Sequence, residues 1–338
     1  MGTVSVSLVV TVKNEAQTLP ELLTSIEAQS RLPDEVIFVD GGSTDGTFKL
    51  LQEWGERQRY PVRILQEPGC NIARGRNLGI AAASGTVIAV TDAGVRLEPQ
   101  WLACLVRPFE QANPPEVVAG VFRGQASGTF HTAMAAAVLP EPEELDPCRF
   151  WPSSRSVAFT KGAWEAVGGY PEWASFCEDL LFDMALAAAG KAFAFAPKAL
   201  VHFPPRRTLH AFFRQYRNYA MGDGQTGLYL SRHLARYATY LGLVPLLLLA
   251  SIHFSPLWLL GYAVGGALYL RRPLLRLARR TQGFPFAARL AAFLWLPVIR
   301  ICGDLAKMLG YPAGLPRGLL LRNLNRRYRA GRLRRIGQ

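Results

Sequence analysis

Short stretches of apolar residues recur along the first hundred positions of the chain, and each stretch ends in polar side chains. The stretches cover residues 6–12, 36–39 and 86–90. They lead into Asn14 and Glu15, into Asp40, and into Asp92, respectively. Apolar runs of this length, separated by helical segments, are typical of parallel strands that are covered on both faces. Because the carboxyl ends of parallel strands meet at one edge of a sheet, we expect these polar groups to line one crevice.

The segments between these runs have the spacing of amphipathic helices, as in the stripe formed by Leu19, Leu22 and Ile26. The pattern predicts helices at 18–29, 47–58, 71–83, 98–111, 161–167, 178–189 and 210–221, and further strands at 62–65, 116–122, 156–159, 192–196 and 199–203. Residues 126–152 show no clear pattern of a helix or a strand. This alternation predicts an α/β fold with an open, mostly parallel sheet flanked by helices.

A different pattern begins at residue 237, where 34 consecutive residues through 270 carry no charge. At about 1.5 Å per residue a single helix of this length would measure roughly 51 Å, which exceeds a hydrocarbon core of about 30 Å. Two crossings, at about 237–254 and 257–270, fit better. We therefore expect one domain at 1–225 and a membrane region at 226–338. The alternative is a pair of buried core helices in a soluble protein.

Arginines flank the uncharged run on both sides, which predicts that both of its ends lie on the cytoplasmic side of a cell membrane. Residues 286–311 are also apolar, but their charged side chains fall within about 60° of one another on a helix. That narrow stripe predicts a helix lying in the interface between membrane and water. The chain is thus expected to be a multi-pass membrane protein with a cytoplasmic front domain and a cytoplasmic Arg-rich end.

The net charge of +13 belongs to the end of the chain. After Leu270 there are 16 Lys/Arg residues and the single acid Asp304, whereas residues 1–270 have 22 basic and 24 acidic side chains. This distribution favours membrane lipids as partners and gives no support to nucleic acid binding by the front domain. The five cysteines are scattered and include no Cys-x-x-Cys pair, so they predict neither a disulfide framework nor a zinc site. The amino terminus shows no export signal.

Several short motifs, in their order and spacing, resemble those of the inverting glycosyltransferases of family 2, which have the GT-A fold. They are Thr11-Val12-Lys13-Asn14-Glu15, Val39-Asp40-Gly41-Gly42-Ser43-Thr44-Asp45-Gly46-Thr47, Ala73-Arg74-Gly75-Arg76-Asn77-Leu78-Gly79-Ile80, Thr91-Asp92-Ala93-Gly94, Gly168-Gly169-Tyr170 and Glu178-Asp179. The resemblance covers about residues 4–225. It implies an enzyme that moves a sugar from a nucleotide-diphosphate sugar to an acceptor.

The resemblance also implies a nucleotide-binding set at the predicted crevice. The set consists of Thr11, Asn14, Glu15, Asp40, Arg76 and Asn77. Asp40 would accept hydrogen bonds from the base or ribose, since a carboxylate suits uncharged donors. Arg76 and Asn77 would meet the diphosphate through charge-assisted hydrogen bonds. Two structural alternatives stay open: Asp40 caps the turn that follows it, and Arg76 is an exposed surface residue.

Asp92 is the expected metal ligand, because Mg²⁺ or Mn²⁺ commonly joins a nucleotide diphosphate to one or two protein carboxylates. The chain departs here from the usual family Asp-x-Asp, since Gly94 occupies the place of the second acid. Metal affinity is therefore expected to be weaker, or another group helps. The resemblance allows His202 in that role, while a histidine satisfied in the core is the alternative.

Glu178-Asp179 points to the type of reaction. Inverting transfer needs one base that takes the proton of the acceptor hydroxyl while its oxygen attacks the anomeric carbon. By resemblance that base is Asp179, although acids in the first turn of a helix also favour its dipole. Ser153-Ser154-Arg155-Ser156 is a further candidate for the acceptor side, which no physical argument from the sequence fixes.

The leading interpretation is a membrane-bound transferase that moves one sugar to an acceptor hydroxyl at the cytoplasmic face. The acceptor itself is unknown and is either a free hydroxyl compound or a lipid-linked one. One alternative enzyme would use a polyprenyl phosphate, whose ionised oxygen needs no base. An alternative from another class is a catalytically silent nucleotide-binding module attached to a membrane complex.

Overall fold

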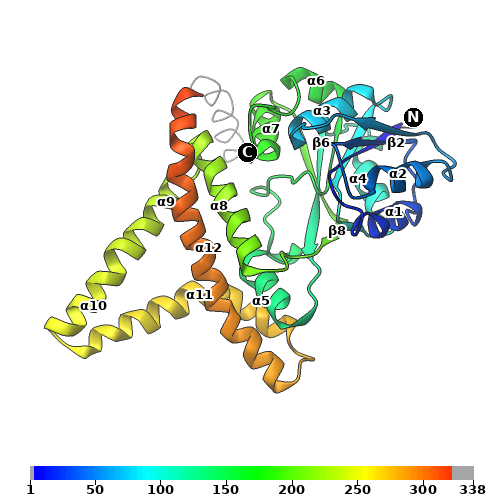
Figure 1. Cartoon of the computed structure of the whole chain (residues 1–338). Helices are drawn as coiled ribbons and strands as arrows, with labels where there is room; N and C mark the ends of the chain where they lie inside the picture. Colours follow the sequence, from blue (N-terminus) through cyan, green and yellow to red (C-terminus); the bar gives the residue numbers. More distant parts are fainter. Residues whose placement is uncertain (1–3, 322–338) are drawn as a thin grey trace. The chain divides into compact units, whose positions relative to one another are not determined.

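A computed structural model describes residues 4–321 of the chain (Figure 1). These residues form two compact units, the first from 4–123 and 142–203 and the second from 124–141 and 204–321. Most of the Arg-rich end lies outside the described residues, so the prediction for it stays a prediction.

The first unit is built on an eight-stranded sheet with the order β3-β2-β1-β4-β7-β6-β8-β5. The strands are β1 (Val6–Val12), β2 (Glu35–Asp40), β3 (Val62–Gln66), β4 (Val87–Asp92), β5 (Arg96–Leu97), β6 (Val117–Gly124), β7 (Val157–Thr160) and β8 (Phe193–Phe203). β3, β2, β1 and β4 are parallel. β7 is antiparallel to β4 and to β6, and β5 is antiparallel to β8. The predicted α/β class is confirmed, and the sheet is mixed.

The strand register brings the predicted polar residues to one edge of the sheet. Asp40 pairs with Val12 at the end of β1, and Asp92 pairs with Thr11 of the same strand. The three parallel strands therefore end side by side, as the apolar runs predicted. This edge is the place where open α/β sheets bind ligands.

Helices cover both faces of this sheet (Figure 1). They are α1 (Leu19–Glu27), α2 (Thr47–Gly55), α3 (Ile72–Ala82), α4 (Trp101–Val106), α6 (Lys161–Val167) and α7 (Glu178–Ala188), with short 3₁₀ turns η1 (Arg107–Glu110) and η2 (Pro142–Glu144). β1 sends Leu8 and Val10 into one core and Val9 into the other, because successive strand residues face opposite sides. Gly79 lets α3 approach closely, since a Cβ there would lie 2.6 Å from Val9 Cγ1.

Three elements differ from the sequence predictions. The two strands predicted at 192–196 and 199–203 form the single strand β8, in which Pro197 is exposed. Its partner β5 pairs only with Val201 and His202, so Pro197 removes no bond from that pair. The helix predicted at 98–111 starts only at Trp101 and passes at Arg107 into η1, which contains Pro108. The weak segment at 126–152 contains a regular helix, whose buried alanines give no amphipathic period.

The second unit consists of helices. They are α5 (Gly128–Val138), α8 (Leu209–Thr226), α9 (Leu230–Tyr237), the π-helical turn η3 (Ala238–Leu243), α10 (Val244–His253), the 3₁₀ turn η4 (Pro256–Leu259), α11 (Leu260–Arg280) and α12 (Phe286–Leu320). α8 and α12 pack closely because α12 carries glycines at the contact. A Cβ at Gly314, for example, would lie 2.0 Å from the carbonyl oxygen of Met221.

Two helical stretches among the described residues, Leu230–His253 and Phe286–Leu320, are long and apolar enough to cross a membrane. The break predicted near His253 falls where α10 ends. The polar stripe of α12 is partnered within its own unit: Asp304 accepts a 2.8 Å hydrogen bond from Arg236 Nε, and Arg300 donates to the Ala137 carbonyl oxygen. The number of crossings, the interfacial placement of 286–311 and the domain boundary at 225 stay predictions.

Candidate active site

The loops after β1 and β2 are joined by hydrogen bonds at the carboxyl edge of the sheet. The Asn14 backbone N–H donates to Ser43 Oγ at 2.9 Å, and the Thr44 N–H donates to Asn14 Oδ1 at 2.9 Å. Asp40 is fully buried and accepts from the Ser43 hydroxyl at 2.5 Å and from the Ser43 N–H at 3.1 Å. The turn-capping interaction that the sequence left open is therefore present. A contact of Asp40 with a nucleotide stays a prediction.

Thr11 belongs to β1, and Glu15 belongs to the loop that follows it. Thr11 Oγ1 is buried and has no hydrogen-bond partner among residues 4–321. Glu15 accepts a hydrogen bond from the Thr18 hydroxyl, and its Oε2 lies 3.3 Å from the place where a Cβ of residue 94 would be. Gly94 has a φ of +74°, a conformation that side chains rarely adopt. An acid at position 94 would thus be strained and would face the Glu15 carboxylate.

Arg76 joins two carboxylates that are far apart in the sequence. Its side chain is only 2% exposed, and its two terminal nitrogens lie 2.8 Å from Asp92 Oδ1 and 2.8 Å from Glu178 Oε1. The guanidinium carbon also lies 5.3 Å from the centroid of the Tyr170 ring. The alternative of an exposed surface arginine is therefore wrong. Arg76 connects the end of β4 with the start of α7.

Burial and charge act in opposite directions on this group. Burial alone lowers the pKa of Arg76, but the charges of Asp92 and Glu178 raise it above its ordinary value. Burial and the neighbouring charge of Asp179 raise the pKa of Glu178, which the attraction to Arg76 only partly offsets. Arg76 is thus permanently charged, whereas Glu178 holds a proton more readily than an ordinary glutamate.

Asp179 lies in the first turn of α7, next to this ion-paired group. Its Oδ1 accepts a 2.8 Å hydrogen bond from the Leu180 N–H. Glu178 is buried, whereas Asp179 is only half-buried. The charge of Asp179 contributes to the raised pKa of Arg76. The role of Asp179 as a base stays a prediction.

The side-chain amide of Asn77 is used within the protein. It donates to the Tyr170 carbonyl oxygen at 2.8 Å and to Glu172 Oε1 at 3.0 Å. Its oxygen accepts from Trp164 Nε1 at 3.0 Å and from the Tyr170 N–H at 2.8 Å. Asn77 thus holds the turn that contains Gly169. The predicted contact between Asn77 and a diphosphate would require this amide to exchange a partner.

His202 lies on β8 opposite Arg96 of β5, and its Nε2 lies 2.5 Å from Glu98 Oε1. Burial lowers the pKa of His202, and the hydrogen bond to Glu98 offsets part of that effect. No group of three or more metal-ligating side chains occurs in the described part of the chain. The role of His202 as a metal ligand stays a prediction.

Asp92 is compatible with a divalent cation by its donor chemistry. Its side chain is 24% exposed, and a hard cation bound to a diphosphate needs only one or two carboxylates from the protein. The missing side chain at Gly94 leaves Glu15 Oε2 as the nearest atom to that position. Asp92 would hold such an ion as a single carboxylate ligand.

Sequence reasoning missed one positively charged neighbour of Asp92. Arg155 Nε lies 3.8 Å from Asp92 Oδ2. No local pattern could have shown this, because the proximity depends on the antiparallel pairing of β7 with β4. The acceptor-side role suggested for the Arg155 segment is not tested by this geometry.

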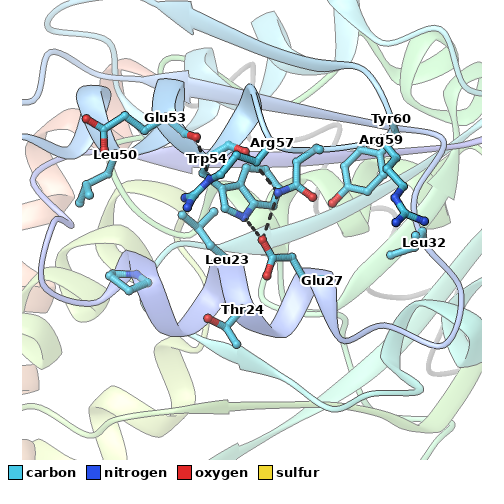
Figure 2. Close-up of a pocket in the computed structure, with 12 residues that line it drawn as sticks. Leu23, Thr24, Glu27, Leu32, Leu50, Glu53, Trp54, Arg57, Arg59 and Tyr60 are labelled. Atoms are coloured by element: carbon cyan, nitrogen blue, oxygen red, sulfur yellow. Dashed lines mark hydrogen bonds between the residues drawn. The ribbon is translucent and has the colours of Figure 1, made fainter.

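A groove of about 610 Å³ lies elsewhere on the first unit, between α1, α2 and the segment before β3. The Glu27 carboxylate accepts hydrogen bonds from Trp54 Nε1 at 2.7 Å (Figure 2) and from the Gln58 amide at 3.0 Å. None of the predicted site residues lines this groove.

Comparison with known families agrees with the motifs. Residues 7–162 match the family described as Glycosyl transferase family 2, and residues 132–301, half of the chain, match the one described as Glycosyl transferase family group 2. The chain therefore belongs to glycosyltransferase family 2.

Individual relatives are more distant. A validoxylamine A glucosyltransferase from Streptomyces hygroscopicus subsp. limoneus is 28% identical over 140 residues, which is 41% of this chain and 31% of that protein. An undecaprenyl-phosphate 4-deoxy-4-formamido-L-arabinose transferase from Pseudomonas syringae is 34% identical over 110 residues, 31% of this chain and 33% of that protein. The chain thus matches about a third of the length of these relatives.

Among solved structures, the mannosyltransferase PcManGT from Pyrobaculum calidifontis, in complex with GDP-Man and Mn²⁺, matches with a TM-score of 0.54 at 20% identity. The match covers 94% of this chain and 87% of that one. At this identity the likeness shows the fold, which confirms the predicted GT-A architecture.

Proposed function

We propose that this protein is a membrane-bound, inverting glycosyltransferase that moves a sugar from a nucleotide-diphosphate sugar to an acceptor hydroxyl. The observation that carries the proposal is the Arg76 bridge between Asp92 and Glu178. It joins the strand end where a diphosphate would bind to the helix that begins with Glu178 and Asp179. A donor and an acceptor group can thus meet at one place.

Asp179 acts as the base in this proposal. It removes the proton from the acceptor hydroxyl while that oxygen bonds to the anomeric carbon and the bond from that carbon to the diphosphate oxygen breaks. The Arg76 cation lies beside the start of α7, where its charge attracts the diphosphate and the acids of the site. Asp179 is more exposed than Glu178.

The nucleotide would lie along the joined loops after β1 and β2. Thr11, Asn14, Glu15 and Asp40 are the proposed contacts there, and the buried hydroxyl of Thr11 is a group that a ligand could satisfy. Asp92 would hold Mg²⁺ or Mn²⁺. Such an ion supplies positive charge to the diphosphate as the sugar leaves.

A membrane location is supported by the second unit. Large apolar side chains are exposed in the helical hairpin formed by α10, η4 and α11, drawn in yellow in Figure 1, including Leu246 at 63%, Phe254 at 83% and Leu257 at 70%. Apolar surface of this extent needs a non-aqueous partner. We propose a multi-pass arrangement in which the first unit is cytoplasmic, on the basis of the flanking arginines.

A second acceptor class is favoured by one relative. The arabinose transferase described above acts on undecaprenyl phosphate, according to its name. A phosphate acceptor is already ionised and would not need Asp179 as a base. The two acceptor classes therefore differ in their demand for that carboxylate.

The function is tested with the full chain in detergent or lipid and a panel of UDP-, GDP-, ADP-, CDP- and dTDP-sugars with Mn²⁺. Release of nucleoside diphosphate with one of these donors, increased by an acceptor alcohol or by undecaprenyl phosphate, is the expected result. Failure of every nucleoside diphosphate to bind, measured by calorimetry, would contradict a nucleotide-sugar transferase.

A further inference from the structure

The segment before β7 brings Arg155 to the candidate active site. β7 runs antiparallel to β4, with Val157 opposite Val90. Arg155 lies in the turn just before β7, which is closed by a 2.8 Å hydrogen bond from the Ser156 N–H to the Ser153 carbonyl oxygen. The Thr91 hydroxyl, at the end of β4, donates a 2.8 Å hydrogen bond to the Arg155 carbonyl oxygen. These bonds hold Arg155 beside the end of β4.

The Arg155 guanidinium is supported by aromatic rings on one side and faces Asp92 on the other. Its central carbon lies 4.9 Å from the centroid of Phe203 and 5.6 Å from that of Phe122. Aromatic faces attract such a cation and orient its plane. This support comes from β6 and β8, so the guanidinium stays near the site even when its polar contact changes.

The two arginines beside Asp92 differ in what they can do. Arg76 contacts Oδ1 at 2.8 Å with a side chain that is 2% exposed, whereas Arg155 lies 3.8 Å from Oδ2 with a side chain that is 24% exposed. Arg76 already compensates the charge of Asp92. Arg155 also donates a 3.3 Å hydrogen bond to Ser153 Oγ, and its longer contact with Asp92 is one that it can exchange for an oxygen of a ligand. The geometry separates a buried positioning arginine from one that a ligand can reach.

The negative charges of the site favour a cationic side chain that can contact a diphosphate. Asp92, Glu178 and Asp179 are acids, and a diphosphate would add further negative charge beside them. Gly94 carries no second acid, so the motif after β4 offers one carboxylate, that of Asp92, for a bridging cation. A guanidinium presents parallel N–H donors that match phosphate oxygens.

We propose that Arg155 binds the diphosphate of the donor directly and stabilises it as it leaves. This inference rests on the proposed function, because it requires a nucleoside diphosphate in the site. It also moves Arg155 from the acceptor side, where the sequence had suggested it, to the donor side.

The test uses calorimetry of UDP and GDP binding to the full chain, with EDTA and with Mn²⁺. The variants are Arg155→Gln and Arg155→Lys, and the matched control is Arg149→Gln, whose side chain is 84% exposed and pairs with Asp146 at 3.6 Å. Binding of the corresponding nucleosides is followed by ligand-observed NMR. The affinity for the nucleoside measures binding of the base and ribose alone, without any contribution from the diphosphate.

Arg155→Gln should weaken binding of the nucleoside diphosphate by about 10- to 100-fold, the range for a hydrogen bond to a charged group, and leave nucleoside binding unchanged. Arg155→Lys should retain part of the affinity, and the control should match the parent. Unchanged diphosphate affinity in Arg155→Gln would overturn the inference while leaving the proposed function intact. Equal weakening for nucleoside and diphosphate would also overturn it, since that indicates a general structural effect. A parent protein that binds neither diphosphate nor nucleoside would remove the proposed function itself.

Discussion

Replacing Arg76 by methionine is the most informative perturbation of this structure. Methionine fills a similar volume but donates no hydrogen bond and carries no charge. Asp92 Oδ1 and Glu178 Oε1 would each lose a donor at 2.8 Å. Removing one partner of a buried ion pair typically costs about 3–5 kcal/mol, because the remaining charge is left uncompensated.

The structure allows this range to be narrowed. The Asp92 side chain is 24% exposed, so water can replace part of what it loses, whereas the Glu178 side chain is only 11% exposed. Most of the cost should therefore arise at Glu178, and we expect a local destabilisation of about 3 kcal/mol, at the lower end of the range. Arg74→Met is the matched control on the same helix. Its side chain is 48% exposed and pairs with Glu67, so its loss should cost no more than about 1 kcal/mol.

The effect should depend on pH with a definite sign. The pKa of Glu178 is raised above its ordinary value of 4.5 in the folded protein, and loss of Arg76 should raise it further. Between the unfolded and folded pKa values the folded state holds a proton that the unfolded state lacks, so stability falls as pH rises. The variant should therefore recover stability as the pH is lowered toward 4.5, the ordinary pKa of a glutamate.

Amide hydrogen exchange of β4 and α7 measures this local free energy directly in the full chain. The expected result is faster exchange in both elements for Arg76→Met, with a smaller difference from the parent at low pH. The reasoning is refuted if Arg76→Met and Arg74→Met behave alike. It is also refuted if the loss in Arg76→Met stays constant across the pH range.

Three further predictions concern function and topology. Asp179→Asn should keep nucleoside diphosphate binding and lower transfer to a hydroxyl acceptor by about 10²- to 10⁴-fold, as measured by product formation. Asp92→Ala should weaken nucleoside diphosphate binding mainly when Mn²⁺ is present, as measured by calorimetry with and without EDTA. Reporter fusions placed after Gln225 and after Arg335 should report the same, cytoplasmic side of the membrane.

Each of these predictions has an outcome that contradicts it. Hydroxyl transfer at near the parent rate in Asp179→Asn would show that Asp179 is not the base, and retained activity on undecaprenyl phosphate would favour the phosphate acceptor. An equal loss of affinity with and without Mn²⁺ would remove the metal role of Asp92. Opposite locations of the two fusions would exclude an even number of crossings.

The sequence alone determined those features of the protein that depend on residues close together in the chain, namely its strands, its helices and its short motifs. Apolar runs and amphipathic spacing predicted β1, β2, β4 and the helices between them, because strand and helix periods are local properties. The order of short motifs predicted the family. The glycine turn after Asp40 could likewise be predicted from adjacent residues. The register of the parallel strands then followed from the apolar runs, and it brought Asp40 and Asp92 to one edge.

Only the tertiary structure decided how the charged residues are used. Arg76 finds its partners 16 and 102 residues away, and Arg155 reaches Asp92 through the antiparallel pairing of β7 with β4. A local sequence pattern predicts neither set of contacts, because each depends on how separate elements pack. The continuity of β8 through Pro197 and the buried helix α5 likewise depend on neighbouring elements rather than on periodicity. The sequence alone therefore identified the family and the edge of the sheet, while packing decided that Arg76 is buried and that Arg155 is partly exposed.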